Sequence, residues 1–185
     1  MQRKLRLTTR EVTDRLIHVF REAGYDGASL EALAAAAGLT RGSLYHHFPG
    51  GKAQMAEAVL NRAGAALSQD ILMPLRARGN TANIINGMLD GVLKYYDGDP
   101  PICLMNALTL GEGHVLFAEK VENAVTAWHR MLAGVFSSGA IDLKDANNEA
   151  TDLLASIQGA LILSRVVGTR QVFEDQIERL RHHNY

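Results

Sequence analysis

The stretch over residues 28–48 constrains the fold more than any other part of the chain, because it predicts two short helices joined by a tight turn. Ser29 is a favourable N-cap, and the alanine-rich run after it favours helix. Gly38 can adopt the left-handed conformation that ends a helix, and Thr40 can cap the next one. Ala34 is small enough to let two helices cross closely. The pattern therefore predicts a helix-turn-helix.

The second of these helices turns Leu44 inward and leaves polar side chains on its outer surface. The outward residues are Thr40, Arg41, Ser43, Tyr45, His46 and His47. Almost all of them carry a hydrogen-bond donor, which is typical of a recognition helix that enters the major groove of DNA.

The same stretch resembles the signature of the tetracycline-repressor (TetR) family of one-component transcription regulators. The resembling positions are Ala34, the run from Ala37 to Phe48, and Lys52. Three residues separate Phe48 from Lys52 where the family usually has two, and this spacing resembles the lincomycin-resistance-repressor-like branch. The resemblance implies a DNA-binding regulator that forms a homodimer through its last two long helices.

Composition and charge agree with a small head joined to a larger body. Few aromatic residues, abundant alanine and leucine and only four prolines favour an all-α protein. Residues 1–55 carry eight Lys and Arg against five Asp and Glu, whereas the remainder carries eleven against fifteen. A basic head on an acidic body suits a DNA-binding module attached to a sensor. We predict a three-helix helix-turn-helix head over residues 1–52 and a helical-bundle ligand-binding and dimerisation body over residues 53–185.

Helix start and stop signals divide the chain further. Thr8 and Glu11 form a capping box that begins the first helix, and Gly24 ends it. Hydrophobic periodicity and breaks at proline and glycine predict the later helices. They cover residues 52–70, 81–96, 102–110, 114–138, 142–167 and 171–183.

Several function classes find no support in the sequence. We expect neither a membrane span nor a secretory signal, because the chain lacks the continuous apolar run that each requires. The single cysteine fits a reducing cytoplasm. The segment around Lys52 lacks the residues of a phosphate loop, and adjacent histidines on a helix point in different directions. We therefore expect no enzymatic activity, no metal site and no cofactor.

Side-chain chemistry ranks the contacts with DNA. Arg41 is the best candidate for reading a base, because a guanidinium matches the two acceptors of guanine. His46 is the next candidate, for a base or a phosphate contact. Gly42 permits a close approach of the backbone. Residues typical of phosphate ligands are Thr40, Ser43, Tyr45 and Lys52.

Some of these residues have a simpler interpretation. Tyr45 could pack against Leu30 or Phe48, and His47 could pack toward the helix that follows. The basic N-terminal tail is either a solvated end or an arm that reaches into a minor groove. Its basic residues are Arg3, Lys4 and Arg6.

The helix predicted over residues 142–167 carries small residues at helical spacing, which would let a second helix approach closely. The expected dimer interface consists of Ala155, Ser156, Gly159, Ala160 and Leu163. A helix-turn-helix usually binds paired half-sites, which favours a dimer. The alternative is that this strip is buried within one body.

The body has no evident task on DNA, so we expect it to bind a small-molecule effector in an apolar cavity. Candidate lining residues are Met88, Tyr95, Met105, Phe117, Trp128 and Met131. Methionine and aromatic residues at helical spacing also make ordinary core, and the sequence does not separate the two roles.

These patterns predict a sequence-specific transcriptional regulator, most simply a repressor that a small apolar ligand releases from operator DNA. An alternative is a redox or electrophile sensor that acts through Cys103, which we expect just inside a helix start, where a thiol pKa is lowered. Its neighbours Ile102 and Leu104 favour an inert, buried thiol instead. A third possibility is a binding module whose head has lost operator recognition.

Overall fold

The computed structural model describes residues 7–139 and 142–183, and within these ranges the chain is helical, with no strand. The predicted all-α fold is therefore confirmed. Internal contacts divide the chain into two compact units. The head unit comprises the residues up to Ala63 together with Leu104–Ala118, and the body unit comprises Gly64–Cys103 together with the residues from Glu119 onward. The functional boundary expected at residue 52 stays a prediction.

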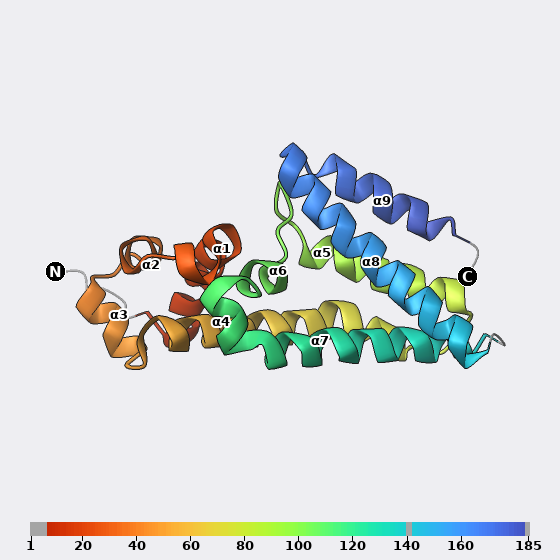
Figure 1. Ribbon diagram of the computed structural model, residues 1–185, viewed down its shortest axis with the longest axis horizontal. Helices are drawn as coiled ribbons and strands as arrows, with labels where there is room; N and C mark the ends of the chain where they lie inside the picture. The colour runs from red at the N-terminus through yellow and green to blue at the C-terminus, as the bar shows by residue number, and fades with distance from the viewer. Residues whose placement is uncertain (1–6, 140–141, 184–185) are drawn as a thin grey trace. The chain divides into compact units, whose positions relative to one another are not determined.

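Three helices at the start of the chain form the predicted DNA-binding part of the head unit: α1 (Thr9–Gly27), α2 (Leu30–Ala37) and α3 (Arg41–His47) (Figure 1). The predicted capping box begins α1, since Glu11 N–H donates to Thr8 Oγ1 at 3.2 Å and Thr8 N–H donates to Glu11 Oε2 at 2.7 Å. The hydrogen bonds from Thr8, first from its backbone and then from its side chain, lower the pKa of Glu11. The basic tail with Arg3, Lys4 and Arg6 lies outside the described residues.

Gly24 interrupts α1 where the sequence predicts its end. Its φ is 67° and its ψ is −171°, and one further helical turn follows as far as Gly27. A Cβ at Gly24 would lie 2.8 Å from the carbonyl oxygen of Ala107, in the short helix α6 (Leu104–Leu108). Glycine is therefore required here both for the backbone conformation and for the close packing of α1 against α6.

Two long helices run across the division between the units. Helix α4 (Gly51–Leu67) begins in the head unit, and a π-helical turn (Ser68–Leu72) and a 3-10 turn (Pro74–Arg76) follow it. Helix α7 (Gly111–Ser137) also begins in the head unit and ends in the body unit.

The helix predicted over residues 102–110 is shorter than expected, and this places Cys103 differently. Helix α6 begins at Leu104, so Cys103 precedes the helix instead of lying in its first turn. The hydroxyl of Tyr96 donates to Cys103 Sγ at 3.5 Å and holds the thiol in the connecting loop. The expected position of Cys103 just inside a helix start is therefore wrong.

The body unit contains α5 (Thr81–Tyr95), most of α7, α8 (Leu143–Val167) and α9 (Gln171–Arg181). Their bounds agree with the predicted ranges to within a few residues. Helices α8 and α9 lie side by side, and α5 packs against α9 (Figure 1). A Cβ at Gly91 in α5 would collide with the Asp70 carbonyl, so glycine lets α5 approach the π-helical turn.

Each unit has its own apolar core. The head core includes the buried residues Leu16, Phe20, Leu33, Leu44 and Phe48. The body core includes the buried residues Tyr96, Trp128, Phe136, Ile157 and Phe173. The hydrophobic faces predicted from helical periodicity therefore point inward in both units.

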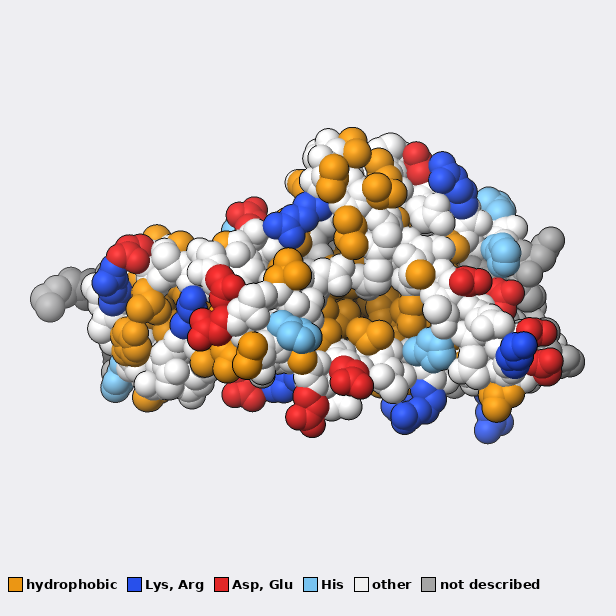
Figure 2. Space-filling view, in the orientation of Figure 1, with side chains coloured by type: hydrophobic (Ala, Val, Ile, Leu, Met, Phe, Trp, Pro, Cys, Tyr) orange, Lys and Arg blue, Asp and Glu red, His pale blue; other side chains and the backbone are white. Residues whose placement is uncertain are grey.

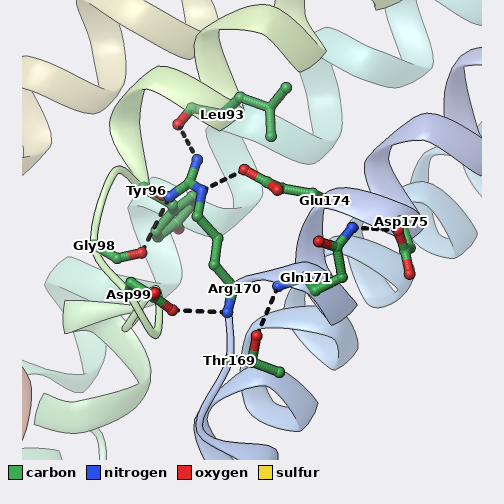
Figure 3. A network of polar contacts seen from close by, with 9 residues as sticks. All are labelled: Leu93, Tyr96, Gly98, Asp99, Thr169, Arg170, Gln171, Glu174 and Asp175. Atoms are coloured by element: carbon green, nitrogen blue, oxygen red, sulfur yellow. Dashed lines mark hydrogen bonds and ion pairs between the residues drawn. The ribbon is translucent and has the colours of Figure 1, made fainter.

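Arg170, in the turn between α8 and α9, ties the end of α5 to the start of α9 (Figure 3). Its guanidinium donates to the carbonyl oxygens of Leu93 and Gly98, each at 3.1 Å, to that of Tyr96, and to Glu174 Oε1 at 2.6 Å. Its backbone N–H donates to Asp99 Oδ1 at 2.8 Å. A single cation thus caps carbonyls that the last turn of α5 leaves without helical partners.

Candidate functional site

The predicted helix-turn-helix forms through its caps. Ser29 Oγ accepts from Ala32 N–H at 3.1 Å at the start of α2. Gly38 ends that helix in the left-handed region, with φ 66°, and Thr40 Oγ1 accepts from Ser43 N–H at 3.2 Å at the start of α3. Arg15 of α1 donates to the carbonyl of Ala37 at 2.7 Å, which fixes the end of α2 on α1. These local bonds orient α3.

The outer surface of α3 carries the predicted recognition residues, while Leu44 and the following Phe48 are buried in the head core. The exposed residues are Thr40, Arg41, Gly42, Ser43, Tyr45 and His46. A Cβ at Gly42 would meet nothing within 4 Å, so the backbone there is open to a partner. The exposed face is thus polar and unobstructed, as contact with DNA requires.

Tyr45 is partly exposed on the surface of α3, and its phosphate role stays a prediction. The residue is 42% exposed. Its ring also borders the loop after α3, since a Cβ at Gly51 would lie 3.6 Å from Tyr45 Cε1. Packing against the loop would therefore hold the ring while leaving the hydroxyl free to bind.

His47 is turned away from the recognition surface. Its Nδ1 lies 3.2 Å from Thr9 Oγ1, at the start of α1, and its ring lies 6.4 Å from that of Phe48. The residue links the end of α3 to α1, whereas the sequence suggested packing toward the helix that follows.

Glu31 is a residue of this surface that the sequence analysis missed. It lies in the first turn of α2 and forms an ion pair with Arg41, the predicted base reader. Both side chains are largely exposed. The one available signal was an isolated acidic residue in an otherwise apolar helix, and the sequence alone does not reveal which cation it faces.

Lys52 makes two contacts with Tyr25. Its ammonium donates to the Tyr25 carbonyl oxygen at 3.0 Å and lies 4.4 Å from the centre of the Tyr25 ring. Burial, followed by the nearby charges of Glu112 and Asp26, raises the pKa of Tyr25, so its ring is held as neutral phenol. The phosphate role of Lys52 stays a prediction, and the structure adds a competing set of contacts.

The predicted interface residues on α8 divide between its two faces. Ala160 is buried, Ser156 and Gly159 are half-buried, and Ala155 and Leu163 are exposed. A Cβ at Gly159 would meet nothing within 4 Å. The strip therefore borders solvent along one edge.

Further apolar side chains extend this exposed edge toward the end of α8. They are Ile162, Leu163, Val166 and Val167. Figure 2 shows hydrophobic side chains gathered over the C-terminal half of this helix. Helix α8 is long and apolar enough to cross a membrane, and 33% of its most apolar stretch is buried. Core helices of soluble proteins can have the same length and composition. An apolar helix left this open calls for a covering surface.

Five of the six predicted effector-binding residues are buried. Met105 and Phe117 belong to the head unit, whereas Met88, Tyr95 and Trp128 belong to the body unit. The sixth, Met131, lines a pocket of about 320 Å³. The other lining residues are Leu75, Ala77, Ile84, Gly134, Val135 and Ser138.

Among the buried candidates for effector binding, Trp128 has the feature most typical of a ligand contact. Its indole Nε1–H is buried and has no hydrogen-bond partner among the described residues. Buried donors are rarely left without a partner, so this N–H is suited to a bound ligand.

Cys103 is buried in the body unit beside Tyr96. Burial, the strongest influence, together with the neighbouring thiol, raises the pKa of Tyr96 well above its ordinary value. A buried thiol that accepts a hydrogen bond from a neutral phenol lacks the solvent exposure typical of reactive cysteines. Within the described ranges, no group of three His, Cys, Asp or Glu side chains could hold a metal ion.

Two family models match the chain. One, described as bacterial regulatory proteins of the tetR family, matches residues 12–59. The other, described as the C-terminal domain of LmrA/YxaF-like transcriptional regulators, matches residues 76–179. Together these matches include the helix-turn-helix and most of the body unit.

Known proteins similar to this chain include transcription regulators, and some of their structures contain operator DNA. The HTH-type transcriptional regulator LmrA of Bacillus subtilis (strain 168) is 26% identical over 151 residues, 79% of this chain and 80% of that protein. A cysteine mutant of the regulator CifR, complexed with 26-bp operator DNA, has a TM-score of 0.78 at 19% identity, covering 97% of this chain and 98% of that one. AibR, complexed with isovaleryl coenzyme A and operator DNA, has a TM-score of 0.66 at 19% identity, covering 91% and 95%.

Proposed function

Because the chain belongs to the TetR family of bacterial transcription regulators, we propose that it is a homodimeric repressor released from operator DNA by a small apolar effector. The observation that carries this proposal is the exposed polar face of α3, held between the caps at Thr40 and Phe48. We also propose that it acts in the cytoplasm, where operator DNA is found.

The proposed DNA contacts follow the chemistry of that face. Arg41 and His46 read base edges, and Gly42 lets the backbone approach the duplex. The phosphate ligands are Thr40, Ser43 and Tyr45. Arg41 must exchange Glu31 for guanine, and the exposure of both side chains keeps the cost of that exchange small.

The proposed dimer uses the exposed edge of α8. Ala155 and Gly159 let a second helix approach closely, and Leu163 supplies apolar area beside them. The remaining members of the strip, Ser156 and Ala160, support the same edge from its inner side. A dimer would set two recognition helices about one turn of DNA apart, roughly 34–36 Å.

The proposed effector site lies around Trp128, whose indole N–H lacks a partner among the described residues. Within the body unit, Met88, Tyr95 and Met131 remain the predicted apolar lining, whereas Met105 and Phe117 belong to the head unit and are not part of the proposed site. AibR, a protein of similar fold, is bound to both isovaleryl coenzyme A and operator DNA. Release requires that the effector bind the DNA-incompetent state more tightly than the DNA-bound state.

The alternative function, a thiol switch at Cys103, has weaker support. CifR, studied as a cysteine mutant, is similar in fold, but Cys103 is buried and bonded to Tyr96. Peroxide or an electrophile should then leave DNA binding unchanged. Release by peroxide that disappears in both Cys103→Ser and Cys103→Ala would favour the switch.

Genomic footprinting with the purified protein tests the proposal. We expect protection of a small set of sites with paired half-sites, and loss of that protection when a suitable apolar effector is added. The variant Arg41→Ala serves as a control for recognition by α3. Protection without any sequence preference would instead indicate a head that has lost operator recognition.

A further inference from the structure

The Lys52 ammonium has two partners within the head unit, both supplied by Tyr25. It donates a charge-assisted hydrogen bond to the Tyr25 carbonyl oxygen at 3.0 Å and lies 4.4 Å from the ring centre. That carbonyl belongs to the last turn of α1, where carbonyls lack helical N–H partners and attract a cation. The Tyr25 ring is buried, so its face is a fixed platform.

The platform is itself anchored to the start of α7. The Tyr25 ring meets that of Phe117 edge-on, with 5.7 Å between the ring centres. The neighbouring Asp26 accepts from the backbone N–H of Glu112 at 3.2 Å. The turn that holds Lys52 is therefore fastened to residues that lie far along the chain but within the head unit.

On its other side, Lys52 is joined directly to the loop that borders Tyr45. Gly51 has φ +69°, and its N–H donates to the Phe48 carbonyl at 2.9 Å. A Cβ at Gly51 would lie 3.6 Å from Tyr45 Cε1, so the first residue of α4 lies beside one edge of that ring. Any displacement of the first turn of α4 would therefore move the support of Tyr45.

We propose that Lys52 is a positioning residue, which seats the start of α4 on Tyr25 and so orients Tyr45 toward DNA, and that it is not itself a phosphate ligand. The carbonyl and the ring face already engage the ammonium, so turning it toward a phosphate would weaken its contacts with Tyr25. The phosphate role expected from the sequence is thereby reassigned. The inference rests on the proposed DNA-binding function for one of its two readouts.

The first readout is the salt dependence of DNA binding. The probe is a duplex that the wild-type protein selects from a random-sequence library, and the variants are Lys52→Met and Lys52→Arg. We expect Lys52→Met to weaken binding on the order of tenfold at every salt concentration, with the wild-type salt slope. Lys52→Arg keeps a cation for the ring and the carbonyl, so it should restore most of the affinity. A slope lower by about 0.9 in Lys52→Met would reveal a lost phosphate contact and overturn the proposal.

The second readout needs no DNA. Amide hydrogen exchange at residues 55–58, the first N–H groups of α4 with acceptors inside the helix, should be faster in Lys52→Met than in the wild-type protein, while exchange in α2 stays unchanged. Arg62→Met is the matched control, because Arg62 is another α4 cation and pairs with Asp14. It should leave both the exchange at residues 55–58 and the salt slope as in the wild type. Unchanged exchange in Lys52→Met overturns the proposal, even if the wild-type protein selects no duplex and the proposed function fails.

Discussion

The caps of the helix-turn-helix in the head unit and the Arg170 network in the body unit show two different ranges of interaction. In the head, side chains bond to backbone groups three residues away, as at Thr8, Ser29 and Thr40. In the body, Arg170 bonds groups that lie 71 to 77 residues before it in the chain. Local bonds can be predicted from sequence spacing, whereas distant ones depend on how the helices pack. The comparison predicts that single substitutions will affect the two units in different ways.

The largest effect is expected at the distant contacts of the body. Arg170→Ala should lower the free energy of unfolding of the body unit by about 2–4 kcal/mol, because several half-buried carbonyls and Glu174 lose their donor. Trp128 is the only tryptophan and is buried in the body unit, so its fluorescence during urea unfolding measures this loss. Arg179→Ala is the control, because Arg179 is exposed on α9 and should change stability by at most about 0.5 kcal/mol. Similar losses in both variants would contradict a special role for Arg170.

The next effect concerns the edge of α8. Gly159→Leu should weaken dimerisation by about 2–3 kcal/mol, because a branched side chain would prevent the close approach of a second helix. Analytical ultracentrifugation should then detect monomers that bind operator DNA poorly. Gly64→Leu is a matched control, since a Cβ at Gly64 also meets nothing within 4 Å. A Gly159→Leu protein that remains a stable, DNA-binding dimer would locate the interface elsewhere.

In the head, a substitution on the recognition surface should change selectivity more than stability. Arg41→Ala should cost about 1–3 kcal/mol at a single operator position and relax the preference there. Binding to a set of duplexes, each with one altered base pair, measures the effect. An equal loss on every duplex would make Arg41 a phosphate contact.

The smallest effect is expected on the free energy of unfolding at alkaline pH, where Tyr96 of the body unit can be compared with Tyr25 of the head unit. The pKa of Tyr96 is raised well above its ordinary 10.0, chiefly by burial, so the folded body keeps this phenol protonated after the unfolded chain has begun to ionise. Its contribution to stability is therefore complete below pH 10 and is lost as the pH rises beyond that value, at about 1.4 kcal/mol per pH unit.

Tyr96→Phe should remove this part of the alkaline slope, at a cost of about 1 kcal/mol at neutral pH for the lost hydrogen bonds. Urea unfolding at several pH values above 9 gives the measurement. Tyr25→Phe is the comparison in the head, where the pKa of Tyr25 is also raised. If the body-unit slope is unchanged in Tyr96→Phe, another group controls alkaline unfolding.

The sequence predicts the fold well wherever the controlling interactions are local. The capping box at Thr8, the left-handed Gly38 and the cap at Thr40 could all be identified from residue type and spacing. The partners of charged side chains could not, since Glu31 faces Arg41 across a turn and Lys52 reaches Tyr25 from another helix.

In the rest of the chain, the conformation of loops and the burial of individual side chains also could not be predicted from the sequence. Cys103 lies outside helix α6, although the predicted helix includes it, because its contact with Tyr96 holds the loop, and no periodicity encodes that contact. Likewise, Met105 and Met131 look alike in the sequence, but one is buried in the head unit and the other lines a pocket of the body unit.

The discontinuity of the head unit limits how such a protein can be recombined. The segment Leu104–Ala118 contributes Ala107 beneath Gly24 and Phe117 against Tyr25, although it is encoded far downstream of the helix-turn-helix. A crossover that transfers only the residues up to Ala63 would move the helix-turn-helix without the segment that packs against α1. Chimeric regulators that exchange operator specificity should therefore inherit both segments from the same parent, or confine the exchange to the outer face of α3.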